Sequence, residues 1–136
     1  MLIAALNFCQ FFRGLFKNQK VVLADPEDSL QSIIDQMSSL GISQMPMTIG
    51  KGDLRMVEEL DILRAVAGGE HSLQDSAREI ARPLQGQVEP SQTLDHVQQV
   101  FEDNNVAIVV DAGKIVGVVN KIDLLEFFTR KNRQAA

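Results

Sequence analysis

The chain has 136 residues, of which 45% are hydrophobic and 23% are charged, and its net charge is −5. This composition suits a single globular protein with a buried core and excludes a globally disordered chain. The acidic balance argues against a nucleic-acid-binding protein, which would carry a basic face. The single cysteine, Cys9, excludes an intramolecular disulfide and fits a reducing, cytoplasmic location.

The first segment, residues 1–19, is apolar and rich in phenylalanine. Its basic residues follow the apolar stretch, whereas a signal peptide carries them before it. No apolar run in the chain reaches the roughly 20 residues that a membrane-spanning helix needs. We expect an N-terminal helix that docks on its own protein or on a partner. A helix on the membrane surface and a leader that is removed are the alternatives.

A short apolar strand, a proline turn and a helix start then occur twice. They read "VVLADPEDSL" at 21–30 and "QVEPSQTL" at 87–94, with the prolines and the final leucines each 64 positions apart. Small polar residues before each helix can cap it, namely Asp28 or Ser29 in the first copy and Ser91 or Thr93 in the second.

Apolar residues recur at helical spacing over 29–40 and again over 92–103. Gly41 ends the first helix, and Asn104 and Asn105 end the second, because glycine and then asparagine best tolerate a left-handed helix end. Two strands joined by a turn follow in each copy, expected at 42–47, 54–57, 106–111 and 115–119.

The segments "EELDIL" and "NKIDLL" then place Asp61 and Asp123 in the first turn of a further helix. Each copy therefore reads strand, helix, strand, strand, helix, which predicts an α/β (α+β) fold of two half-domains about a pseudo-twofold axis. A short helix is expected near 73–81. The predicted division is 1–19 N-terminal helix and linker, 20–67 first repeat, 68–86 connector, 87–131 second repeat and 132–136 C-terminal tail.

The two aspartates are the best candidates for binding chemistry. A carboxylate in the first turn of a helix is favoured by the positive end of the helix dipole. Its two oxygens can accept hydrogen bonds from the two hydroxyls of a ribose, and nearby helix N–H groups can bind a phosphate or carboxylate. An acidic residue is also common at this position without a ligand, so a purely structural role is the alternative.

The duplicated βαββα unit, with "GISQMPM" and "GVVNKIDLL", resembles a tandem pair of CBS domains, the module called a Bateman domain, over about residues 20–130. "EELDIL", "NVAIVVDAGKIVGVVNKIDLLEFF" and "TRKN" look most like the C-terminal regulatory region of cystathionine β-synthase and its bacterial relatives. The resemblance implies a regulatory module and not an enzyme. It also implies a homodimer formed through the repeats and an attached or associated enzyme domain.

The resemblance implies no cofactor but an adenosine-containing effector, either S-adenosylmethionine or an adenine nucleotide (AMP, ADP or ATP). The family signature has a glycine, then a threonine or serine, then the aspartate. The second junction keeps Gly117 and Asp123 but has Asn120 at the hydroxyl position, and the first keeps Asp61 with Glu58 there. Glu58 would repel a polyphosphate by about 1 kcal/mol at 4 Å even in bulk water, which favours S-adenosylmethionine.

In the family the strand of one repeat faces the helix junction of the other, which implies two clefts. The favoured cleft is predicted to involve Val21, Ile42, Ser43, Gln44, Met45, Asn120, Ile122 and Asp123. The weaker cleft is predicted to involve Val106, Ala107, Ile108, Glu58, Leu60 and Asp61. Because both junctions lack the hydroxyl residue, the alternative is a constitutive dimerisation or protein-interaction module with clefts that bind nothing.

Catalytic and metal chemistry are not indicated by the sequence. His71 and His96 lack metal-ligand spacing and are predicted to lie on the surface. Cys9 has no recognisable catalytic partner and is predicted to be a small core residue. We therefore expect no enzyme activity, no catalytic residue and no metal site.

Overall fold

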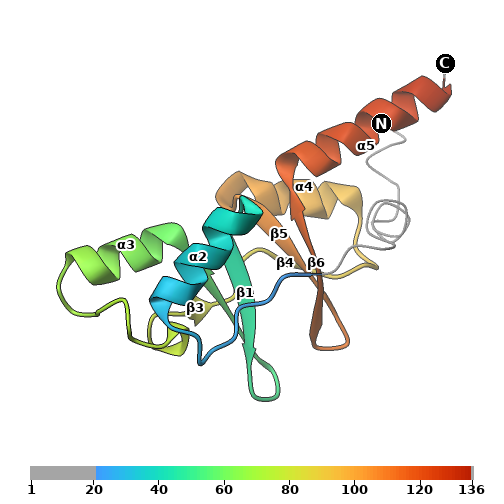
Figure 1. Ribbon diagram of the computed structural model, residues 1–136. Helices are drawn as coiled ribbons and strands as arrows, with labels where there is room; N and C mark the ends of the chain where they lie inside the picture. The colour runs from blue at the N-terminus through green and yellow to red at the C-terminus, as the bar shows by residue number, and fades with distance from the viewer. Residues whose placement is uncertain (1–20, 136) are drawn as a thin grey trace. The chain divides into compact units, whose positions relative to one another are not determined.

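The computed structural model describes residues 21–135, so the N-terminal helix predicted for 1–19, with Cys9, lies outside the described residues. The described chain forms two compact units, Val22–Leu84 and a second unit that begins at Gln85. Each unit contains one three-stranded sheet and its own helices (Figure 1). In this part of the chain, every helix is too short or too polar to cross a lipid bilayer.

The first unit has a sheet with strand order β1-β2-β3, in which both outer strands pair antiparallel with β2. The elements in chain order are α2 (Leu30–Leu40), β1 (Gln44–Ile49), β2 (Asp53–Glu58), α3 (Glu59–Ala67), the 3₁₀ helix η1 (Ala77–Glu79) and β3 (Arg82–Pro83). The helix predicted near 73–81 is thus limited to the single turn of η1.

Helix α2 begins and ends where the sequence predicts. The Ser29 hydroxyl oxygen accepts a hydrogen bond from the Ser32 backbone N–H at 3.1 Å, which caps the first turn. Gly41 ends the helix with a φ of 67°, in the left-handed region that glycine tolerates best. The buried face of the helix consists of Leu30, Ile33 and Met37.

The strand predicted at the start of 21–30 does not form. The Ala24 backbone N–H donates to the Pro46 carbonyl at 2.8 Å, but Pro46 has no N–H to donate in return. Because the N–H and C=O of one strand residue point to the same side, Pro46 interrupts the ladder on this edge of β1. The third strand is instead β3, from the segment predicted to be a connector.

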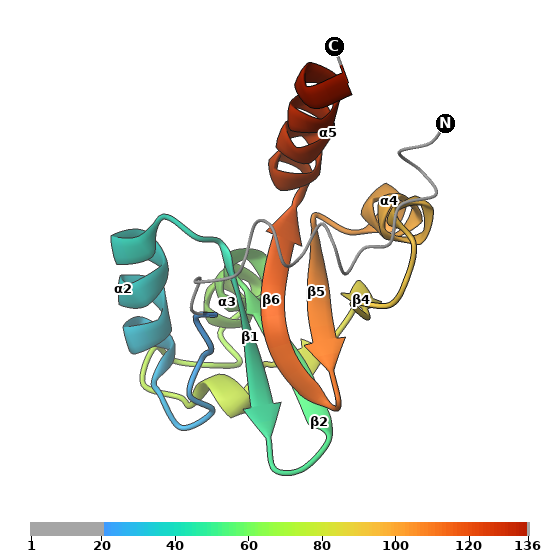
Figure 2. The same ribbon diagram turned by 90° about the vertical axis from the view of Figure 1, so that its right-hand side faces the viewer.

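The second unit has the strand order β4-β5-β6, with β4 parallel and β6 antiparallel to β5. Figure 2 shows α4 beside β5 and shows α5 leaving the end of β6. The predicted order of strand, helix, strand, strand, helix is confirmed here. The elements are β4 (Gln87–Val88), α4 (Leu94–Asp103), β5 (Val106–Asp111), β6 (Lys114–Asn120) and α5 (Lys121–Ala135).

Helix α4 starts as predicted but ends differently. The Thr93 hydroxyl oxygen accepts from the His96 backbone N–H at 3.2 Å, so Thr93 is the N-terminal cap. Asn104 at the other end has a φ of −134°, which is extended and not left-handed. Its side-chain amide donates to the Val100 carbonyl at 2.9 Å. The side chain of Asn104, rather than its backbone conformation, therefore satisfies the helix end.

Each unit buries its own apolar core. The first core contains Ala24, Leu30, Ile33, Met37, Met45, Met47, Val57, Ile62, Ala77 and Ala81. The second contains Val88, Leu94, Val97, Phe101, Ala107, Val109, Val119 and Leu124. The equivalent leucines at the start of α2 and α4, Leu30 and Leu94, are 0% and 1% exposed. The repeated sequence pattern thus places the same side chain in the core of each unit.

Candidate functional site

The junction between β6 and α5 fixes Asp123 against Asn120. Asp123 Oδ2 accepts from the Asn120 backbone N–H at 2.9 Å, and Asn120 Oδ1 accepts from the Asp123 backbone N–H at 3.0 Å. Two backbone donors at the strand end and helix start are thereby satisfied reciprocally. A serine or threonine hydroxyl at position 120 could accept the same bond. Asn120 therefore preserves the cap although it departs from the family signature.

The Asp123 carboxylate retains acceptor capacity after this cap is made. Its side chain is half-buried, and Oδ1 has no hydrogen-bond or ion-pair partner among residues 21–129. Each carboxylate oxygen has two lone pairs, so Oδ2 can also accept a second hydrogen bond. The carboxylate is held in a fixed orientation at the start of α5 and remains able to accept from hydroxyl groups.

The junction between β2 and α3 repeats the cap with Glu58 and Asp61. Asp61 Oδ2 accepts from the Glu58 backbone N–H at 3.0 Å. The Glu58 side chain in turn accepts from the Asp61 backbone N–H, which completes a capping box. Both acidic residues singled out by the sequence therefore have a local structural role in starting a helix. The two junctions differ in what lies against the carboxylate.

Arg82, on β3, occupies the outer side of the first junction. Its Nε lies 2.9 Å from Asp61 Oδ1, and its Nη2 lies 3.5 Å from Glu58 Oε2. Both oxygens of Asp61 are thus engaged within the first unit, and this side chain is only 11% exposed. Arg82 also offsets the charge of Glu58, so the repulsion expected from Glu58 toward a phosphate is smaller than the sequence alone implies.

Arg82 could not be predicted from the sequence, because this residue lies in the predicted connector, far from either junction along the chain. Only the pairing of Met56 with Arg82 in the β2–β3 ladder brings its side chain to the start of α3. This contact depends on which strands pair in the sheet. The spacing of apolar residues along the sequence does not reveal that pairing.

Ser43 and Gln44, two of the residues predicted for the favoured cleft, provide half-buried polar groups in the first unit. Ser43 Oγ donates to Gln44 Oε1 at 2.8 Å, and the Ser43 carbonyl accepts from the Glu59 backbone N–H at 3.0 Å. The Met45 side chain is fully buried in the core of the first unit. An open groove of about 440 Å³ in this unit is lined by Ile34, Met37, Ser38, Gly41, Ile42, Ser43 and Glu59.

The other predicted residues divide between the surface and the interior. Ile122 and Leu60 are 55% and 46% exposed at their helix starts, whereas Val21 is half-buried. The β5 residues Val106, Ala107 and Ile108 are buried. Each unit brings its own junction residues together, namely Asn120, Ile122 and Asp123 in one and Glu58, Leu60 and Asp61 in the other. The pairing of one repeat's strand with the other repeat's junction stays a prediction.

Comparison with known proteins identifies this architecture. Residues 77–130 match the family model of the CBS domain. A solved protein with CBS domains from Burkholderia ambifaria is 24% identical, with a TM-score of 0.72 over 88% of this chain and 91% of that chain. A CBS-domain-containing protein from Agrobacterium tumefaciens is 20% identical, with a TM-score of 0.70 over 88% of this chain and 96% of that chain.

A third similar structure contains ligands. It is the CBS domain pair of protein MJ0100 in complex with 5′-methylthioadenosine and S-adenosyl-L-methionine. It is 20% identical, with a TM-score of 0.66 over 84% of this chain and 92% of that chain. At these identities the solved structures establish the fold, and the family model identifies a CBS domain whose matched residues lie mostly in the second unit. Residues 77–130 therefore match the CBS domain, and the chain as a whole has the fold of solved CBS-domain proteins.

Proposed function

We propose that this chain is a regulatory module that senses an adenosine-containing effector. One observation carries the choice of site. Asp123 is oriented by its cap yet keeps acceptor oxygens for a ligand, whereas both oxygens of Asp61 are engaged by the Glu58 backbone and Arg82. The junction at 120–123 is therefore the better candidate for holding the ribose of the effector.

The chemistry of this junction suits a nucleoside. A carboxylate can accept hydrogen bonds from both hydroxyls of a ribose, and bonds to a charged acceptor are stronger than neutral ones. The positive end of the α5 dipole favours an acidic side chain at this position and can also attract an anionic group. Because the cap already fixes Asp123, binding does not have to order this side chain, which lowers the entropic cost.

The choice of effector depends on a similar solved structure and on the charges near the first junction. The similar CBS pair of MJ0100 was solved with S-adenosyl-L-methionine and 5′-methylthioadenosine, which supports an adenosine compound. The electrostatic preference for S-adenosylmethionine depended on Glu58, and Arg82 reduces that preference. S-adenosylmethionine remains our favoured effector, and AMP, ADP and ATP belong in the same test. The enzyme domain that such a module would regulate, attached or associated, is part of this proposal.

A second candidate function is a constitutive dimerisation module. A nearly apolar groove of about 220 Å³ in the first unit is lined by Ile34, Glu59, Ile62, Leu63, Val66 and Leu73. Leu63 in this groove is 62% exposed. Such an apolar surface on two helices favours association with a second copy of the chain. A homodimer is compatible with ligand sensing, so the two functions differ in whether an adenosine compound binds at all.

Thermal melting of the intact chain separates the two functions. We expect one of S-adenosylmethionine, AMP, ADP and ATP to raise the melting temperature. A ligand at 100 times its dissociation constant adds about 2.7 kcal/mol to stability, or roughly 5–10 °C in a protein of this size. An unchanged melting temperature with all four compounds, in a sample that light scattering shows to be dimeric, would contradict ligand sensing and favour the dimerisation module.

A further inference from the structure

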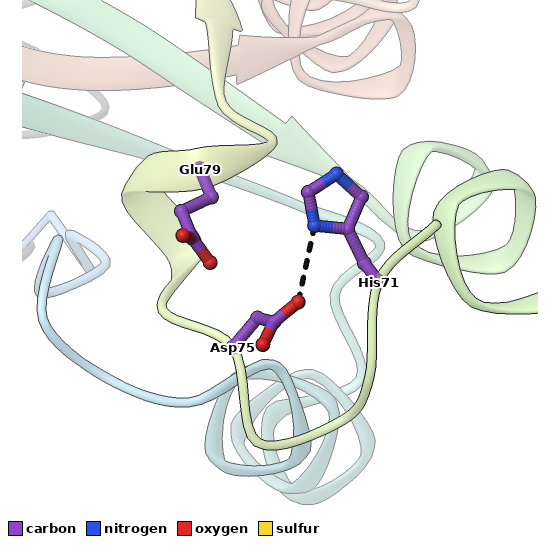
Figure 3. A group of neighbouring side chains, drawn as sticks. All are labelled: His71, Asp75 and Glu79. Carbon is purple, nitrogen blue, oxygen red and sulfur yellow. Dashed lines mark hydrogen bonds and ion pairs between the residues drawn. The ribbon is translucent and has the colours of Figure 1, made fainter. Parts of the chain in front are cut away.

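Three side chains of metal-binding type converge in the segment between α3 and β3. They are His71, Asp75 and Glu79, and their ligand atoms all lie within 4.8 Å of one another. His71 Nδ1 is 3.1 Å from Asp75 Oδ2. Figure 3 shows the imidazole and the two carboxylates directed toward a common space. This cluster belongs to the first unit and involves neither of the acidic junctions.

The three residues lie four positions apart in the sequence, but a turn and not a continuous helix brings them together. The Asp75 backbone N–H donates to the Ser72 carbonyl at 3.0 Å, and Asp75 Oδ2 accepts from the Ser72 backbone N–H at 3.1 Å. This turn brings Asp75 back toward His71. The 3₁₀ helix η1 then places Glu79 on the same side.

The backbone that carries the cluster is anchored to neighbouring elements. The Leu30 N–H donates to the Asp75 carbonyl at 2.9 Å, and the His71 N–H donates to the Ala65 carbonyl at 3.2 Å. Ala77, between two of the ligands, is fully buried. The ligands are thus mounted on a fixed segment, and preorganisation of this kind lowers the cost of binding an ion.

The charge of the cluster also favours a cation. Two carboxylates and one imidazole carry a net negative charge when the imidazole is neutral. Arg78, the basic residue within the segment, is engaged elsewhere because its Nη2 lies 2.6 Å from Glu27 Oε1. His71 and Asp75 are half-buried and Glu79 is exposed, so an ion could reach the cluster from solvent.

We propose that His71, Asp75 and Glu79 bind a divalent transition-metal ion of the zinc class. One imidazole nitrogen and two carboxylate oxygens form a donor set that zinc accepts, whereas calcium and magnesium prefer oxygen donors throughout. Zinc bonds of about 2.1 Å in tetrahedral geometry separate ligand atoms by roughly 3.4 Å. The exposed Glu79 side chain would move toward the ion to bind it. The ion would take the place of the hydrogen between His71 and Asp75.

Zinc titration by calorimetry tests the site. Cys9 is the single cysteine of the chain and could bind zinc itself, so the intact chain is studied both as the natural sequence and with Cys9→Ser. We expect one Zn²⁺ per chain in both. His71→Ala and Glu79→Gln should each weaken binding at least tenfold, since even outer-shell changes cost tenfold or more. His96→Ala removes the other histidine of the chain and should bind zinc normally.

Three results would overturn the proposal. These are an absence of zinc binding in the Cys9→Ser chain, binding that survives either His71→Ala or Glu79→Gln, and equal losses in His71→Ala and His96→Ala. Melting curves without zinc show whether each variant folds. If His71→Ala fails to fold, the isosteric Glu79→Gln decides alone, because the Glu79 side chain is exposed.

Discussion

Replacing Leu30 with alanine is expected to lower the free energy of unfolding by about 2–5 kcal/mol. The Leu30 side chain has no exposed surface and lies in the core of the first unit with Ile33 and Met45. Truncation removes buried apolar surface and leaves a cavity in a closely packed core. Leu94→Ala should have an effect of the same size, since Leu94 is 1% exposed in the second core. Urea unfolding monitored by circular dichroism measures both.

Leu40→Ala is the matched control for this experiment. Leu40 ends the same helix as Leu30 but is 52% exposed. An exposed substitution of this type changes stability by about 0.5 kcal/mol or less. If Leu30→Ala and Leu40→Ala lower the free energy of unfolding equally, Leu30 is not a core residue and the repeated pattern of apolar positions has been misinterpreted.

Gly86→Ala is expected to lower the free energy of unfolding by about 2–4 kcal/mol. Gly86 has a φ of +73°, and an added Cβ would lie 2.8 Å from the Val106 carbonyl oxygen. The Gly86 carbonyl also accepts from the Ile108 N–H at 2.8 Å. Relief of the clash would therefore strain the backbone contact between the start of the second unit and β5.

Gly113→Ala separates the clash from the cost of the dihedral angle. Gly113 has a φ of +77°, but an added Cβ would meet nothing within 4 Å. This variant should lose only about 1 kcal/mol, the usual cost of a left-handed residue other than glycine. Chemical unfolding of both variants measures the difference, and equal losses would show that the close approach at Gly86 has no energetic consequence.

The sequence predicted local features of the fold better than pairings between distant segments. The α2 helix could be placed because apolar spacing, the Ser29 cap and the Gly41 end all agree. The strand expected near residue 21 failed because its formation depends on a partner, and Pro46 in that partner cannot complete the ladder. Asn104 was correctly expected to end α4, but its side chain and not its backbone provides the cap.

The same distinction applies to the candidate site. Asp123 could be placed in the first turn of a helix because a strand-to-helix transition is visible in the sequence. Its hydrogen bond to the Asn120 backbone is equally local. Arg82 could not be found because it reaches Asp61 only through strand pairing. His71 and Glu79 converge through a turn, which is likewise invisible to periodicity.

The Asp123 carboxylate is the group that we propose to hold the ribose of the effector. Asp123→Asn is the sharpest variant, because the amide keeps one oxygen for the Asn120 N–H but replaces the other with a donor. Glu126→Gln is the control, since it removes one exposed negative charge from the same helix. Each chain is titrated calorimetrically with the adenosine compound that gives the largest melting shift.

We expect the natural chain and Glu126→Gln to bind that compound equally, and Asp123→Asn to bind at least tenfold more weakly. A hydrogen bond to a charged acceptor contributes about 1.5–3 kcal/mol, and 1.4 kcal/mol corresponds to tenfold in affinity. Equal affinity of Asp123→Asn and the natural chain, with the variant folded, would contradict the account.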